Sequence, residues 1–263
     1  MTGSDERREI TRRIAREGVE FSETFARMLL VLAAAGVFCG YFAINRYTIG
    51  RETHSLETFI DALIPFSPIW QWFYFAIYYF LFLPGLLIRD FGVFKRTVAA
   101  FVCVQVVAYV CFLAFPVRMC RPVDPFPLDT FWAWGVALNY ALDPPFNCFP
   151  SLHLANAFLA AFVARRLDRA VGGVALVIAV LIGLSTLFTK QHFLADVFGG
   201  TALAYGSYRI FVEPHIPDLP RRELSYGRAR LLVLPAAYGA VVLVLFIGYR
   251  SGWQPFPWPL PPL

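Results

Sequence analysis

The feature that most constrains this chain is a series of long apolar stretches that contain no Asp, Glu, Lys or Arg. These charge-free stretches cover residues 28–45, 62–88, 97–117, 144–164, 170–189 and 231–249. Each is close to, or longer than, the roughly 17 to 25 residues with which an α-helix crosses a bilayer. Charged residues make up only 16% of the chain, against roughly 25% in soluble proteins. The sequence therefore excludes an ordinary soluble domain and predicts an integral membrane protein.

Two changes to this set of charge-free stretches give the number of spans: one further run is added, and one long stretch is split. The run 193–211 also qualifies as a span, because its single acid and single arginine stand near opposite ends, where the arginine can reach the interface. The stretch 62–88 is too long for one span, and Pro65 and Pro68 separate a short amphipathic segment from a helix at about 69–88. The expected fold is an all-α membrane helical bundle with about seven transmembrane spans.

Basic residues are distributed unevenly between the loops that join the predicted spans. The N-terminal segment and every second loop after it hold 6, 3, 3 and 5 of the 23 Lys and Arg residues, and the other loops and the tail hold the remaining six. Lys and Arg in short loops stay on the cytoplasmic side. The N-terminus is therefore predicted to be cytoplasmic and the C-terminus to lie on the other side.

This topology divides the chain into three parts. Residues 1–27 mix Arg with acidic residues and place apolar side chains near one helical face, so we expect an amphipathic helix on the cytoplasmic membrane surface or a plain solvated helix. Residues 28–249 form the transmembrane domain, and residues 250–263 form a proline-rich tail whose two Trp suit the interface. The net charge of +5 comes from scattered Arg, so nucleic acid is not an expected partner.

Polar and titratable side chains collect at three places. The groups are Arg118 with Arg121, Ser151 with His153, and Ser185 through His192 with Asp196. In the predicted topology all three lie on the non-cytoplasmic side. Polar side chains at membrane depth are costly and are functional candidates by default, so these three groups define the candidate site.

The spacing of these residues indicates phosphate chemistry. His192 and Asp196 are four residues apart, so on a helix the carboxylate can accept a hydrogen bond from one imidazole nitrogen and leave the other as a nucleophile or base. His153 follows Pro150, which suits the first turn of a helix, where free N–H groups favour an anion. The nearby cations are Arg118, Arg121 and Lys190. Together these groups predict a phosphate-transfer site that needs no metal or other cofactor.

Over about residues 110–212 the motifs resemble the type 2 phosphatidic acid phosphatase (PAP2) superfamily. The signature of that family is a Lys-x6-Arg-Pro segment, then Pro-Ser-Gly-His, then Ser-Arg-x5-His-x3-Asp, and both order and spacing match. This chain has Ala114 in place of the Lys, Leu152 in place of the Gly and Thr186 in place of the Arg. Phe-Pro-Ser-Leu-His with Ser-Thr-x5-His-x3-Asp is most similar to the branch that contains the inositol phosphorylceramide synthases, which transfer a phosphoinositol head group.

The resemblance implies a fold, a function and a role for each residue. The fold would be a bundle with a six-helix core, and the function would be cleavage or transfer of a lipid phosphate ester through a phosphohistidine intermediate, with no cofactor. His192 would be the nucleophile, Asp196 its orienting acid and His153 the general acid. The phosphate-binding residues would be Arg118, Arg121, Ser151 and Lys190, with Lys190 taken as a substitute for the missing Arg at Thr186. The partners would be a lipid phosphate and, for transfer, a lipid alcohol.

Several alternatives stay open at this point. The enzyme could be a simple phosphatidic acid or polyprenyl (pyro)phosphate phosphatase, or the chain could be a transporter or scaffold without catalysis. Arg118 and Arg121 could merely reach the interface, and the hydroxyls of Ser185 and Thr186 could bond their own helix. Neither a Cys120–Cys148 disulfide nor the oligomeric state follows from the sequence.

Overall fold

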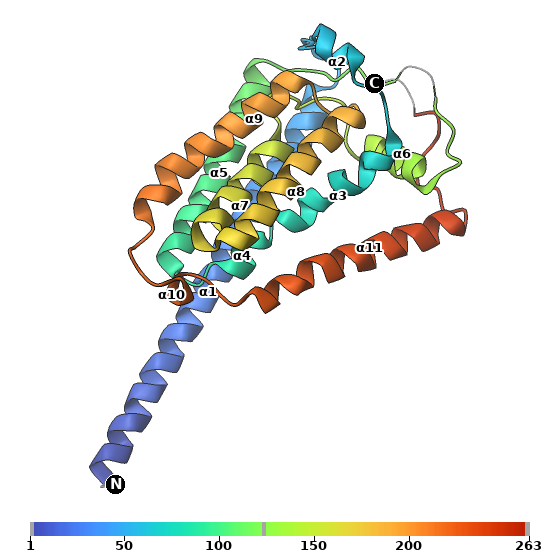
Figure 1. Cartoon of the computed structure of the whole chain (residues 1–263). Helices are drawn as coiled ribbons and strands as arrows, with labels where there is room; N and C mark the ends of the chain where they lie inside the picture. Colours follow the sequence, from blue (N-terminus) through green and yellow to red (C-terminus); the bar gives the residue numbers. More distant parts are fainter. Residues whose placement is uncertain (1–2, 123–124, 261–263) are drawn as a thin grey trace.

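The computed structural model describes residues 3–122 and 125–260, and for residues 3–21 it describes the backbone only. This part of the chain is helical, with two isolated β-bridges and no β-strand. The α-helices are α1 (Gly3–Thr48), α2 (Phe59–Leu63), α3 (Gln71–Phe80), α4 (Leu83–Leu87), α5 (Phe91–Ala114), α6 (Phe131–Leu142), α7 (Leu152–Leu167), α8 (Arg169–Phe188), α9 (Leu194–Ser207), α10 (Arg221–Leu224) and α11 (Val233–Arg250). Shorter 3-10 and π turns are η1 (Pro68–Trp70), η2 (Tyr208–Val212), η3 (Glu213–His215) and η4 (Arg228–Leu232). The all-α prediction is confirmed for these residues (Figure 1).

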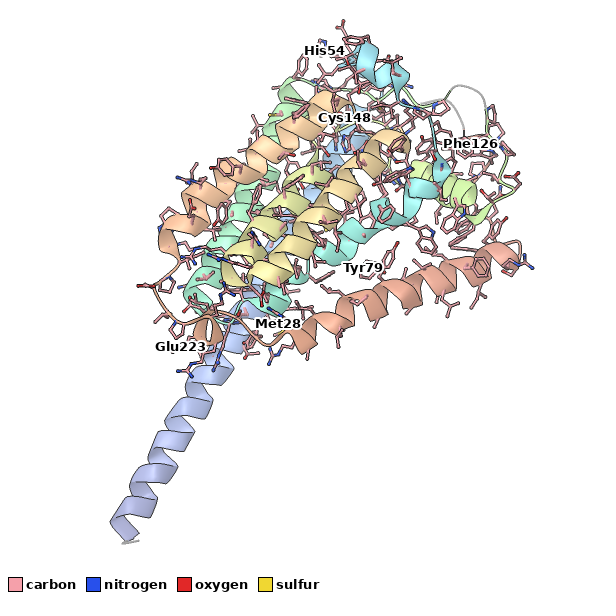
Figure 2. All side chains as sticks on the ribbon, viewed as in Figure 1. Met28, His54, Tyr79, Phe126, Cys148 and Glu223 are labelled. Carbon is pink, nitrogen blue, oxygen red and sulfur yellow. The ribbon has the colours of Figure 1, made fainter. Side chains whose placement is uncertain are left out.

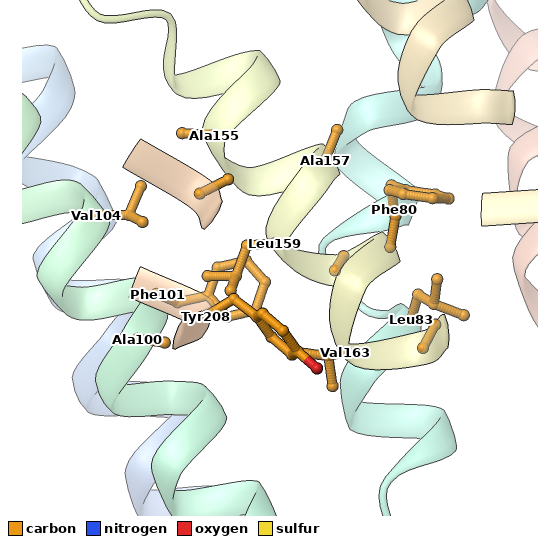
Figure 3. Packing of buried hydrophobic residues seen from close by; sticks show 14 of the residues in the cluster. Phe80, Leu83, Ala100, Phe101, Val104, Ala155, Ala157, Leu159, Val163 and Tyr208 are labelled. Carbon is orange, nitrogen blue, oxygen red and sulfur yellow. The ribbon is translucent and has the colours of Figure 1, made fainter. Parts of the chain in front are cut away.

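Helix α7 forms the centre of the bundle. Eleven of its 16 residues are buried, and several of them are alanines that let neighbouring backbones approach closely. Leu159 and Val163 of α7 pack with Val104 of α5 and Tyr208 of η2 in the apolar core (Figure 3). Because α3, α5, α8 and α9 all contact α7, the start of this helix is held from several sides.

Four helical segments are long and apolar enough to cross a membrane. They are Ser22–Thr48, Phe91–Ala114, Arg169–Phe188 and Arg228–Arg250. They correspond to four of the predicted spans: 28–45, 97–117, 170–189 and 231–249. An integral membrane protein is therefore supported, while the count of seven spans, the six-helix core and the orientation stay predictions.

The other predicted spans are shorter or interrupted helices. The span at 69–88 is divided, because α3 ends at Phe80 and α4 begins at Leu83 with Pro84 in its first turn, where the missing N–H is tolerated. In the span at 144–164, helix α7 begins only at Leu152. Prolines 144, 145 and 150 precede it and cannot supply helical N–H donors.

The remaining differences lie at the chain ends and in two short elements. Helix α1 continues through residue 27 without a break and extends beyond the bundle (Figure 1), so the predicted boundary between 1–27 and the first span is not a helix end. The side chains of residues 1–21 lie outside the described residues. The predicted span at 193–211 begins at Leu194 and changes to a π-helical turn at Tyr208. Helix α6, with 12 residues, is too short to be recognised as a charge-free span.

Helix α11 diverges from the bundle (Figure 1) and has no buried residue. It is tied to α3 by a hydrogen bond from the Tyr238 hydroxyl to the Trp72 carbonyl, 2.6 Å long. Between α11, α3 and α8 lies a largely apolar groove of about 1070 Å³, towards which Tyr79 points (Figure 2). The proline-rich tail folds back on α6, where Phe256 packs with Trp134 and Leu138. Trp258 Nε1 donates to the Phe126 carbonyl, in the loop before α6, over 3.1 Å.

Candidate active site

Ser151 places the second motif at the start of α7. It is the N-cap residue, and its hydroxyl accepts a hydrogen bond from the Leu154 N–H over 3.4 Å, as expected for a serine at this position. Its own N–H donates to the Asp196 carbonyl over 3.1 Å, which links the second motif to the third. His153 therefore stands in the first turn of α7 and faces the beginning of α9.

A tight turn after α8 returns His192 towards α7. Lys190 adopts a positive φ of 50°, and the Thr186 carbonyl accepts from the N–H groups of Gln191 and His192 over 2.8 and 3.2 Å. This pattern ends a helix with a left-handed residue, usually Gly or Asn. The Thr186 hydroxyl bonds its own helix at the Gly183 carbonyl, and the Ser185 hydroxyl does the same at Ile182. The backbone of the third motif therefore forms the turn that positions His192, while the Ser185 and Thr186 hydroxyls donate to carbonyls of their own helix, α8.

The three predicted catalytic side chains lie together. His192 Nδ1 is 3.3 Å from Asp196 Oδ2, and His192 Nε2 is 3.1 Å from His153 Nδ1. A carboxylate at Asp196 can only accept, so the His192 Nδ1–H donates to it and leaves a lone pair on Nε2. The hydrogen between the two rings then belongs to His153 Nδ1. This chain of contacts directs a lone pair of His192 at an N–H of His153.

Asp196 is held by the backbone as well as by His192. Its carboxylate accepts from the Phe193 N–H over 2.8 Å and is fully buried. Gly200, one turn later on α9, allows this helix to approach α7 closely, because a Cβ there would lie 2.3 Å from the Ser151 carbonyl oxygen. Gly200 therefore serves the close packing of α9 against the start of α7.

Of the two predicted arginines, Arg121 points into the bundle and Arg118 is exposed. The Arg121 guanidinium donates to the carbonyls of Tyr140 and Asp143 and to Gln191 Oε1, at 3.2, 2.6 and 2.7 Å. Its Nε is buried and has no hydrogen-bond partner among the described residues. Arg118 lies over the Phe146 ring at 5.6 Å. Arg121 is therefore the better placed cation for an anion beside His192.

The Lys190 side chain binds backbone carbonyls in and just after α2. Its ammonium donates to the carbonyls of Asp61 and Ile64 over 3.0 and 2.6 Å. The Asp61 carboxylate in turn accepts from the Leu194 N–H over 2.7 Å. Burial alone would raise the pKa of this carboxyl, but hydrogen bonds from Thr58 and from the Leu194 N–H, with the Lys190 charge, lower it. We therefore leave Lys190 out of the proposed phosphate-binding set.

The structure adds polar residues that the motifs did not indicate. The Tyr74 ring of α3 packs on His153 with ring centroids 4.6 Å apart. Asp143 Oδ1 accepts from the Tyr41 hydroxyl over 2.8 Å and from Asn45 Nδ2 over 3.0 Å. Burial raises the pKa of the Asp143 carboxyl, although the Arg121 charge opposes it. Asn45 is a polar residue at the end of a charge-free stretch, and that signal indicates it. Tyr41 and Tyr74 are two of many aromatic residues in such stretches, and Asp143 lies just outside the stretch 144–164.

The cysteines give no disulfide in this structure. All five are free thiols, with Cys120 exposed and Cys148 buried in the end of the bundle next to α2 (Figure 2). Ligand-type atoms of Cys148, His192 and Asp196 lie within 4.8 Å of one another, close enough to hold a metal ion. The Cys148 thiol donates to the Pro145 carbonyl over 3.4 Å, and the independence from metals stays a prediction.

Comparison with known proteins assigns the family. A family model described as the PAP2 superfamily matches residues 42–210, more than half of the chain. No curated protein and no solved structure shows significant similarity to the chain. The matched segment includes all three motifs and both histidines of the pair. The chain therefore belongs to the PAP2 superfamily, a group of phosphatase-type enzymes.

Proposed function

We propose that this protein cleaves or transfers a phosphate ester of a membrane lipid, through a covalent phosphohistidine at His192. The observation that carries the proposal is the pair of contacts at His192: Nδ1 on the Asp196 carboxylate and Nε2 directed at His153 Nδ1. A histidine oriented by a buried acid is activated as a nucleophile. The position of the active site on the non-cytoplasmic face is part of the proposal and is supported by the distribution of Arg residues.

In the first step the Nε2 lone pair attacks phosphorus. A P–N bond forms, the P–O bond to the leaving alcohol breaks, and His153 in its protonated form gives a proton to the departing oxygen. The two rings are in direct contact at 3.1 Å, so the phosphoryl group has to separate them when substrate binds. After this step His153 is neutral and can act as a base.

In the second step an oxygen nucleophile resolves the intermediate. His153 takes a proton from water or from an alcohol, the oxygen attacks phosphorus, and the P–N bond breaks. Water gives hydrolysis, and a lipid alcohol gives transfer. Leu152 and Thr186, which resemble the inositol phosphorylceramide synthase branch, favour inositolphosphotransferase-like head-group transfer. Simple hydrolysis of phosphatidic acid or a polyprenyl (pyro)phosphate is the second candidate.

The proposed phosphate site consists of Arg121, Ser151 and Arg118. Arg121 provides a guanidinium that already reaches Gln191 next to His192, and a planar guanidinium can bind two phosphate oxygens. Ser151 opens α7, whose first N–H groups favour negative charge. Exposed Arg118 contributes long-range attraction for an anionic head group.

Product analysis tests the proposal. Purified wild type and His192→Ala are given labelled lipid phosphates and phosphoinositides, with and without ceramide or diacylglycerol and with and without EDTA. Free phosphate from wild type alone would establish a phosphatase, and a new phospholipid that requires the acceptor would establish a transferase. Identical products from both proteins would contradict the role of His192, and product from neither would support the transporter or scaffold alternative. Loss of activity with EDTA that Mg²⁺ restores would contradict a metal-free mechanism.

A further inference from the structure

Three segments of the chain bring side chains of three metal-ligand types together beside the histidine pair. Cys148 precedes α7, His192 lies in the turn after α8, and Asp196 stands in the first turn of α9. The Cys148 sulfur, a ring nitrogen of His192 and a carboxylate oxygen of Asp196 lie within 4.8 Å of one another. All three side chains are buried, with exposed fractions of 1%, 5% and 0%. The fold creates this cluster, because residue 148 is far in sequence from the other two.

The distances within the cluster are close to those of a tetrahedral metal site. The nitrogen on this side of His192 is Nδ1, which lies 3.3 Å from Asp196 Oδ2, whereas Nε2 points to His153. Zinc bonds of about 2.0 to 2.3 Å place tetrahedral ligand atoms about 3.3 to 3.6 Å apart. The nitrogen and oxygen already have this separation. With no separation above 4.8 Å, the Cys148 sulfur has to approach by no more than about 1.3 Å.

The other contacts of these side chains leave the ligand atoms available. Asp196 Oδ2 accepts from the Phe193 N–H over 2.8 Å, which orients the carboxylate. Asp196 Oδ1 is buried and has no hydrogen-bond partner among the described residues. The Cys148 thiol makes a 3.4 Å contact to the Pro145 carbonyl, and a thiol is a weak donor. An ion can reach His192 by the path that a phosphate group needs in the proposed function.

The donor atoms select the ion. Mg²⁺ and Ca²⁺ take oxygen ligands, whereas thiolate and imidazole are typical ligands of Zn²⁺, together with carboxylate. The thiolate of Cys148 and the carboxylate of Asp196 balance the two charges of Zn²⁺. Three protein ligands leave the fourth tetrahedral position to a water molecule. The cluster therefore has the chemistry of a zinc site.

Zinc at this position removes the lone pair with which His192 attacks phosphorus. Binding to Nδ1 needs the lone pair of that nitrogen, so the hydrogen of the neutral imidazole moves to Nε2, and the thiol proton leaves to solvent. The Nε2–H then donates to His153 Nδ1, whose own hydrogen shifts to the far side of its ring. We propose that Cys148, His192 and Asp196 form an inhibitory zinc site, in which Zn²⁺ holds the nucleophile in an unreactive tautomer. This inference rests on the proposed function and concerns the regulation of the same site.

Binding is tested without substrate, by using Co²⁺ as a coloured substitute for Zn²⁺. A bond between Co²⁺ and a thiolate gives a charge-transfer absorption in the near ultraviolet. We expect this absorption in wild type and in Cys120→Ala, the matched control because Cys120 is an exposed thiol, but not in Cys148→Ala. Zn²⁺ should displace Co²⁺ and abolish the absorption, and Mg²⁺ should not. If wild type and Cys148→Ala give the same absorption, the proposal is overturned.

Inhibition is tested on a lipid phosphate in vesicles, at buffered concentrations of free Zn²⁺ and in EDTA. Cys148→Ala should keep the wild-type rate in EDTA, because the proposed mechanism does not use the thiol. The half-inhibitory Zn²⁺ concentration should rise at least about tenfold in this variant, since loss of an outer-shell partner alone weakens metal binding roughly 10- to 100-fold. EDTA should restore zinc-treated wild type. Equal inhibition of wild type and Cys148→Ala would place the ion elsewhere and overturn the proposal.

The two readouts separate this proposal from the proposed function. A wild type that makes no product in EDTA would contradict the proposed function and with it the inhibitory role, while the Co²⁺ absorption still decides whether the metal site exists. Full activity at a Zn²⁺ concentration that displaces Co²⁺ would overturn the inhibitory role alone. If Cys148→Ala does not fold, Cys148→Ser replaces it, because serine has nearly the same size and is not among the usual zinc ligands.

Discussion

Replacing Gly200 by Ala should separate the second motif from the third. A Cβ at this position would lie 2.3 Å from the Ser151 carbonyl oxygen, 3.1 Å from Leu154 Cβ and 3.2 Å from the Ala155 nitrogen. Real Cβ atoms essentially never come closer than 3.0 Å, so α9 and the start of α7 have to move apart by at least 0.7 Å. The closest of these atoms, the Ser151 carbonyl oxygen, belongs to the backbone, so no side-chain rotation relieves the clash.

The displacement acts directly on the histidine pair. Asp196 lies one turn before Gly200 on α9, and His153 follows Ser151 on α7. Overpacking costs about 1 to 3 kcal/mol, which the better helix propensity of Ala reduces by about 1 kcal/mol. A misplacement of about 1 Å lowers a reaction rate by roughly 100-fold. We therefore expect kcat to fall about 10- to 100-fold with only a modest loss of stability.

The assay measures phosphate or phospholipid production together with thermal unfolding in the same detergent. The matched control is Gly206→Ala on the same helix, where an added Cβ has nothing within 4 Å. This control should keep full activity and gain about 0.5 to 1 kcal/mol. If Gly200→Ala keeps wild-type kcat and stability, the close contact does not position the site and the reasoning is refuted.

Three further predictions address the orienting acid, the docking of α2 and the topology. Asp196→Asn keeps the size of the side chain but changes which nitrogen of His192 carries the proton. The kcat should therefore fall about 10³- to 10⁴-fold, with KM little changed. Equal changes in kcat and KM would argue against an orienting role for Asp196. The pKa of Asp61 is lowered in the folded state, so its ionised carboxylate stabilises the folded protein, by about 1 to 3 kcal/mol. This stabilisation should be present well above the unfolded pKa of about 3.9 and lost as the pH falls through the folded pKa. The destabilisation by Asp61→Asn, measured by thermal unfolding, should therefore shrink between pH 6 and pH 3, and a constant value would contradict the assigned contacts. In a background without native cysteines, a Leu63→Cys label on exposed α2 should react from outside intact cells and an Arg166→Cys label at the opposite end of α7 only after permeabilisation; the reverse pattern would invert the topology.

The site was more predictable from the sequence than the helices were. The spacing of His192 and Asp196 predicts their contact, although His192 lies in the turn just before α9 and not on a helical face. The Pro-Ser start of α7 brings His153 to the same end of the bundle. The structure brings these three side chains together as expected. Capping contacts at the starts of α7 and α9 determine these positions, and they can be read from short stretches of sequence.

The parts that were not predicted depend on tertiary contacts. Charge-free length alone did not reveal that Pro84 starts a new helix or that residues 131–142 form α6. The charge of Lys190 predicts a phosphate contact, whereas its ammonium donates to the carbonyls of Asp61 and Ile64, which are far from it in the sequence. Tyr74 is one of many aromatic residues in an apolar run, and only the packing of α3 on α7 places it on His153.

The measurement that tests the central claim most directly is detection of the covalent intermediate. Wild type and His192→Ala are mixed with a lipid whose phosphorus is labelled, and the reaction is quenched within one turnover. The control is His215→Ala, because His215 lies in η3, outside the candidate site. We predict an acid-labile phosphoryl group on His192 in wild type and in the control, and neither label nor product in His192→Ala. Turnover by His192→Ala at the wild-type rate would contradict the account.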